Sequence, residues 1–142
     1  VIGALAKLPA AIRKRVLHAQ EVLSVGDGLL LNVALSYGAR SEIVEACKKI
    51  AFKAESGTLK AKEIDIETVA AHLWTNGLSD PDILIRTSGE QRLSNFLLWQ
   101  MAYTELFFPQ VCWPDFGREE FLRVLYQYQE RNRRFGKLNR ED

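Results

Sequence analysis

Short apolar runs, typical of buried strands, alternate along this chain with longer segments of helical periodicity. The apolar runs cover residues 29–35, 82–87 and 105–108. Strands separated by helices favour right-handed crossovers and hence a parallel sheet. We therefore expect an α/β fold with a mostly parallel central sheet flanked by helices. Three strands are few, because such sheets average about five to six, so we expect part of the sheet to be missing upstream.

Residues that favour helix starts precede most of the helical segments. The predicted starts are Pro9, Ser41, Asp65, Ser94 and, for the last helix, about Arg118. Gly57 is predicted to end the second helix. Its expected core face is Ile43, Cys47, Ile50 and Ala54, and that of the last helix is Phe121, Leu125, Tyr128 and Phe135.

Composition excludes several classes of protein. Of the 142 residues, 47% are hydrophobic and 26% charged, which suits a packed core rather than a disordered chain. A net charge of +1 argues against a general nucleic-acid binder, and we expect no nucleic-acid partner. Two cysteines cannot build a disulfide scaffold, so we expect Cys47 and Cys112 to be reduced and buried.

The stretch that follows the apolar run 82–87 has the composition of an anion site. Arg86 follows three apolar residues, Arg92 follows a turn that Gly89 allows, and Ser94 is predicted to open a helix. Two guanidinium groups, a hydroxyl and a helix N-terminus suit a phosphate or diphosphate. The alternative is structural: Arg86 pairs with Glu90, and Arg92 is solvated.

The same stretch resembles a known family. The run DPDILIRTSGEQRLSNFLLWQMAYTELFF, followed by WPDF and RNRRFG, is very similar to the cis-prenyltransferases, the undecaprenyl and dehydrodolichyl diphosphate synthases. LLLNVALSYGAR resembles an earlier motif of that family. The resemblance extends from Val1 to about Gly136, and it implies that residues 1–142 are the C-terminal part of a single domain. The N-terminal half of the family, with its phosphate-binding loop, essential Asp and tunnel helices, has no counterpart in this sequence.

The resemblance implies roles for individual residues. Arg86, Arg92 and Ser94 match the residues that hold the diphosphate of isopentenyl diphosphate, and Glu90 is a supporting acid. Glu105 matches a carboxylate that binds Mg²⁺. From its sequence context alone, a surface or capping role is the favoured interpretation of Glu105.

The last family motif lies near the C-terminus. Arg134 and Gly136 match an R-x-G motif that reaches the diphosphate site of a partner subunit across a dimer interface. Without the family, the basic residues around Arg134 are explained by a solvated helix end, where cations are favoured.

The implied activity is condensation of isopentenyl diphosphate with an allylic diphosphate, expected to be farnesyl diphosphate, into a long-chain cis-polyprenyl diphosphate. We expect Mg²⁺ as cofactor, a homodimer with a heterodimer as the alternative, and a cytoplasmic enzyme in peripheral contact with a membrane through its lipid product. A plastid or endoplasmic-reticulum location stays open. We expect residues 1–142 alone to be inactive. The alternatives are a non-catalytic partner subunit of the same family and an unrelated phosphate-binding α/β enzyme.

Overall fold

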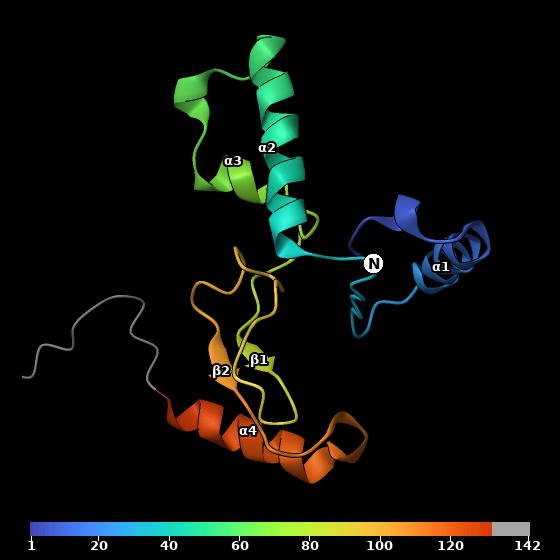
Figure 1. Ribbon diagram of the computed structural model, residues 1–142, viewed down its shortest axis with the longest axis vertical. Coiled ribbons are helices and arrows are strands. Elements are labelled where there is room, and N and C mark those ends of the chain that lie inside the picture. The colour runs from blue at the N-terminus through green and yellow to red at the C-terminus, as the bar shows by residue number, and fades with distance from the viewer. Residues whose placement is uncertain (132–142) are drawn as a thin grey trace, which may run out of the picture. The chain divides into compact units, whose positions relative to one another are not determined.

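The computed structural model describes residues 1–131 (Figure 1). They form two compact units. The N-terminal unit comprises residues 1–78 together with Asn95–Leu97, and the described part of the C-terminal unit comprises Ser79–Ser94 and residues 98–131. No helix among the described residues is long and apolar enough to cross a membrane.

The N-terminal unit is helical. Its elements are the 3-10 turn η1 (Leu5–Lys7), the helices α1 (Ala10–Leu23) and α2 (Ala39–Glu55), the 3-10 turn η2 (Ala61–Glu63) and the short helix α3 (Ile66–Ala70). Figure 1 shows α3 beside α2, and the two helices are in contact. Asp65 caps α3 as predicted, because its Oδ1 accepts the Thr68 N–H at 2.7 Å. Gly57 follows the end of α2 with φ of 72°, also as predicted.

The start and the core face of α2 differ from the prediction. The helix begins at Ala39 after Gly38, two residues before the predicted cap Ser41. Its buried residues are Ala39, Glu42, Ala46 and Ile50. Cys47 is exposed, and so is Cys112. The expectation of buried thiols was wrong: at Cys47 the buried stripe of α2 passes through the preceding residue Ala46, although Ile50 is buried as predicted, and Cys112 lies outside the helices, directly before η3.

The C-terminal unit contains the sheet. Strands β1 (Ile83–Ile85) and β2 (Glu105–Phe107) pair in parallel with Ile83 opposite Glu105 and Ile85 opposite Phe107. They are followed by the 3-10 turn η3 (Trp113–Asp115) and by α4 (Arg118–Glu130). The parallel pairing and the start of α4 at Arg118 confirm the prediction. The buried residues of this unit include Phe107, Met101 and Val124.

Two predicted elements are absent. Residues 29–35 form no strand: only Ala34 bridges Ile2, and Leu29 is 95% exposed. A strand buried on both faces needs neighbours, and among the described residues only the segment at Ile2 pairs with it. The predicted helix after Ser94 is a series of turns instead. Ser94, Asn95 and Leu97 have φ of 47°, 62° and 44°, which a right-handed helix does not accommodate.

Candidate anion-binding site

Arg86 closes the loop that follows β1. Its backbone N–H donates to the Phe107 carbonyl at 2.9 Å, which extends the sheet by one bond. Its Nη1 donates to the Arg92 carbonyl at 2.6 Å and to Ser94 Oγ at 3.0 Å. The three residues predicted to bind an anion are therefore brought together. A guanidinium has five N–H donors, and these contacts engage only Nη1, so further donors of Arg86 remain for an anion.

The tip of the loop is held by its backbone. The N–H of Ser88 donates to the Val111 carbonyl at 2.7 Å, and the N–H of Gly89 donates to the Pro109 carbonyl at 2.9 Å. Gly89 has φ of 65°, and a Cβ at this position would collide with the side chain of Gln110. The turn therefore favours glycine, as predicted, because of its backbone conformation; the end of the flexible Gln110 side chain could move aside.

Glu90 pairs with Arg92, not with Arg86 as the alternative interpretation required. The Arg92 side chain is 64% exposed, so this pair is open to solvent and contributes little to stability. An incoming anion can replace the carboxylate at low cost. The helix N-terminus expected at Ser94 is absent, so the anion site consists of two guanidinium groups and one hydroxyl without a helix dipole.

Glu105 lies at the other end of the strand pair. It begins β2 level with Ile83, whereas Arg86 follows the last residue of β1. At about 3.3 Å of rise per residue, three residues separate the two positions by about 10 Å. The carboxylate of Glu105 forms an ion pair with Arg131, with Nη1 and Oε2 2.6 Å apart.

The described residues offer few carboxylates for the Mg²⁺ that is expected from the sequence. Residues 1–131 contain no group of three or more His, Cys, Asp or Glu side chains that could hold a metal. Mg²⁺ is commonly held by one or two carboxylates together with substrate phosphate oxygens and waters. A single half-buried carboxylate at Glu105 fits that mode of binding. Arg134 and Gly136, the other predicted site residues, lie outside the described part of the chain.

Sequence reasoning missed a buried carboxylate in the first turn of α2. Glu42 is 1% exposed. Its Oε2 accepts the Tyr37 hydroxyl at 2.6 Å, and its Oε1 accepts the Trp74 backbone N–H at 2.8 Å. Burial, followed by the hydrogen bond and negative charge of Glu42, raises the pKa of Tyr37. No local signal predicts this burial, because an acid in the first turn of a helix is usually an exposed partner of the helix dipole.

Asn95 is a second missed residue. Its backbone carbonyl accepts the Ala39 N–H at 2.9 Å, and its Oδ1 accepts the Arg40 N–H at 2.9 Å. It therefore caps α2 from a position 55 residues away in sequence. An asparagine after a serine is the only signal in the sequence, and it indicates a turn rather than a distant cap.

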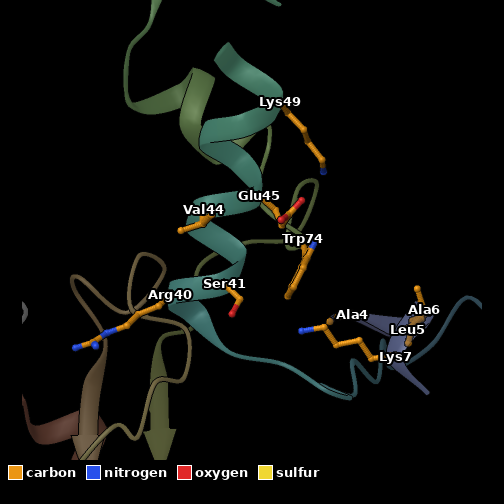
Figure 2. A pocket seen from close by; sticks show the side chains of 11 residues that line it. Ala4, Leu5, Ala6, Lys7, Arg40, Ser41, Val44, Glu45, Lys49 and Trp74 are labelled. Carbon is orange, nitrogen blue, oxygen red and sulfur yellow. The ribbon is translucent and has the colours of Figure 1, made fainter. Parts of the chain in front are cut away.

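The N-terminal unit has an open cavity of about 640 Å³ at the start of α2 (Figure 2). Figure 2 shows Arg40 pointing away from the segment Ala4–Lys7, whereas Glu45 and Lys49 extend from the other side of α2. None of the predicted site residues lines it; its lining is Gly3, Ala4, Leu5, Ala6, Lys7, Arg40, Ser41, Val44, Glu45, Lys49 and Trp74. The cavity therefore contains none of the residues that were predicted to bind a diphosphate or Mg²⁺.

Comparison with known proteins identifies the family. A family model described as "Putative undecaprenyl diphosphate synthase" matches residues 1–136. The chain belongs to this family. The resemblance to the cis-prenyltransferases is thereby confirmed, and an unrelated phosphate-binding α/β enzyme is excluded.

Individual relatives of the cis-prenyltransferase family agree with this assignment. The chain is 51% identical to an isoprenyl transferase of Geobacter sulfurreducens over 98% of this chain and 56% of the relative. It is 46% identical to a tritrans,polycis-undecaprenyl-diphosphate synthase (geranylgeranyl-diphosphate specific) of Thermoplasma acidophilum, over 96% of this chain and 53% of the relative. The chain therefore spans about half the length of these curated relatives.

A solved structure shows the same fold. The lavandulyl diphosphate synthase of Lavandula x intermedia, crystallised with dimethylallyl diphosphate, superimposes with a TM-score of 0.92 at 42% identity. The match covers 96% of this chain and 58% of that protein. The α/β fold expected from the sequence is confirmed by this likeness and by the parallel pairing of β1 with β2.

Proposed function

We propose that this chain supplies the isopentenyl-diphosphate site of a cis-prenyltransferase that elongates an allylic diphosphate into a long-chain cis-polyprenyl diphosphate. The observation that carries the proposal is the loop closed by Arg86 on the Arg92 carbonyl and on Ser94 Oγ. This loop gathers two cations and a hydroxyl within the motif that defines the family. The loop requires little reorganisation to receive an anion, because Arg86 already holds it closed.

The residues act by positioning and by neutralising charge. The diphosphate of isopentenyl diphosphate lies between Arg86 and Arg92, and Ser94 donates its hydroxyl to a phosphate oxygen. Arg92 leaves Glu90 to bind the anion. The substrate is thereby oriented so that its double bond attacks the allylic carbon from which diphosphate departs. Loss of a proton then gives the new cis double bond.

Glu105 would hold Mg²⁺ together with diphosphate oxygens and a carboxylate from another part of the protein. When bound, the cation neutralises charge on the diphosphate groups. Glu105 lies three residues, about 10 Å, along the strands from Arg86. The allylic substrate is proposed to be farnesyl diphosphate.

The full protein is proposed to be a homodimer, with Arg134 and Gly136 completing the partner's site. It would be cytoplasmic and would contact a membrane through its lipid product. Residues 1–142 alone should lack activity, since the relatives they match are about twice as long. A non-catalytic subunit of the same family is the second candidate, but the arginines of the loop, which such subunits tend to lose, are intact here.

The test is steady-state kinetics of Arg86→Ala and Arg92→Ala in the full-length protein. A charge-assisted contact contributes about 1.5–3 kcal/mol, so each variant should lose about 10- to 150-fold in kcat/KM, mainly through a higher KM for isopentenyl diphosphate. Arg→Lys should rescue only partly, because an ammonium cannot bind two oxygens as a fork does.

Arg123→Ala is the matched control, because Arg123 also pairs with a carboxylate, that of Glu120 at 2.9 Å, but lies on α4 and not in the loop of Arg86 and Arg92. It should keep normal kinetics. Loss of affinity for the allylic diphosphate alone in the Arg86 and Arg92 variants would show that the loop serves the other substrate. Unchanged kinetics in both variants would favour the non-catalytic subunit.

A further inference from the structure

A single guanidinium contacts all three residues of β2. Arg131, directly after the end of α4, donates through Nη1 to Glu105 Oε2 at 2.6 Å and to the Leu106 carbonyl at 3.4 Å. Its Cζ lies 4.1 Å from the ring centroid of Phe107. Phe107 is 4% exposed, so the ring is a fixed platform for the cation. These contacts hold Arg131 against the one carboxylate that is proposed to bind Mg²⁺.

We propose that Arg131 is the resident counter-ion of Glu105 and that it sets the affinity of this carboxylate for a divalent cation. The inference rests on the proposed role of Glu105. A divalent cation at Glu105 must share or displace a guanidinium that already neutralises the carboxylate. Before cation and diphosphate arrive, Arg131 keeps the Glu105 side chain in one orientation. Arg131 thus acts through Glu105 and is a positioning residue.

The exposure of the pair suits such an exchange. The Glu105 side chain is 25% exposed and that of Arg131 is 43% exposed. A fully buried pair would be costly to separate, whereas a partly exposed pair separates readily because water solvates both partners. The Phe107 ring offers Arg131 a second favourable contact, so the guanidinium can remain on β2 after it yields the carboxylate.

The test measures Mn²⁺ binding to the full-length protein without substrate, from the loss of the electron paramagnetic resonance signal of the free ion. Arg131→Gln should bind Mn²⁺ about three- to tenfold more tightly, because the competing charge is gone. Arg131→Lys keeps the charge and should stay close to wild type. Thermal unfolding followed by circular dichroism verifies that each variant is folded.

Two further variants make the outcome decisive. Arg123→Gln removes the same charge from α4 but leaves Glu105 untouched, and it should bind Mn²⁺ as wild type does. Unchanged or weaker binding by Arg131→Gln, or equal tightening by Arg123→Gln, would overturn the inference. Glu105→Gln tests the proposed metal ligand itself: if its Mn²⁺ titration equals that of wild type, the assignment of Glu105 fails, independently of Arg131.

Discussion

Removal of the buried carboxylate of Glu42 should cost this protein considerable stability. Both of its oxygens accept short hydrogen bonds, from the Tyr37 hydroxyl and from the Trp74 backbone N–H. Glu42→Ala leaves two donors without their acceptor, at about 1–3 kcal/mol each and so about 2–6 kcal/mol together, and the cavity adds to this cost. The free energy of unfolding should fall by that amount.

Two milder variants separate charge from hydrogen bonding. In Glu42→Gln the amide oxygen can still accept from the Trp74 N–H, and the amide nitrogen can donate to the Tyr37 oxygen if that hydroxyl rotates. The expected cost is about 1–2 kcal/mol. Tyr37→Phe removes one donor from a buried charge and should cost about 1.5–3 kcal/mol. The double variant should cost less than the sum, because both changes break the same bond.

Urea unfolding of the full-length protein, followed by far-ultraviolet circular dichroism, measures these costs. Glu45→Ala is the matched control. It removes an acid from the same helix, but Glu45 is paired only at the surface, with Lys48 at 2.8 Å, so its loss should change the free energy of unfolding little. The reasoning is refuted if Glu42→Ala costs no more than this control, or if Glu42→Gln costs as much as Glu42→Ala.

The raised pKa of Tyr37 adds a pH dependence. Its folded-state pKa lies above the ordinary value of 10.0 because burial and Glu42 disfavour the phenolate. The unfolded chain therefore releases this proton at a lower pH than the folded protein. The contribution of Tyr37 is complete below pH 10 and declines as pH rises above it. The difference in unfolding free energy between wild type and Tyr37→Phe should shrink above pH 10, and a constant difference would contradict this assignment.

Two further predictions concern a strained turn and the dimer. Ser36 has φ of 49°, a conformation that asparagine tolerates better than serine, so Ser36→Asn should raise the unfolding free energy by a few tenths of a kcal/mol, whereas Ser36→Val should lower it; equal melting temperatures would contradict the role of this conformation. If Arg134 completes the partner's site, mixing full-length Arg134→Ala with Arg86→Ala chains should restore activity above that of either homodimer. A mixture no more active than its components would place Arg134 in its own subunit or outside the site.

The elements that the sequence predicted correctly are those determined by local signals. The side-chain cap at Asp65, the glycine after α2 and the start of α4 each depend on a few neighbouring residues. The parallel pairing of β1 with β2 follows from the crossover between them. The family motif led to the loop of Arg86, Arg92 and Ser94, which the structure brings together.

The features that escaped prediction depend on contacts between distant residues. Residues 29–35 have the composition of a buried strand, but they lack pairing partners on both sides among the described residues. The burial of Glu42 depends on Trp74, 32 residues away. Because the sequence pattern of α2 counts only apolar residues, it placed the core face of this helix at Cys47. Glu105 pairs with Arg131, 26 positions away, and no local sequence pattern predicts this ion pair.

The segment after Ser94 shows why a local signal can be overruled at a site. A serine before an apolar run predicts a helix cap, but here two consecutive residues, Ser94 and Asn95, bind groups outside the predicted helix. Ser94 Oγ accepts from Arg86, and the next residue, Asn95, accepts two N–H groups at the start of α2. Both residues adopt positive φ to do so, at a cost of order 1–3 kcal/mol each. Such strain persists only where surrounding contacts outweigh it, and it is concentrated here in the motif that the proposed substrate site requires. The failed helix prediction is thus itself an indication of where the function lies.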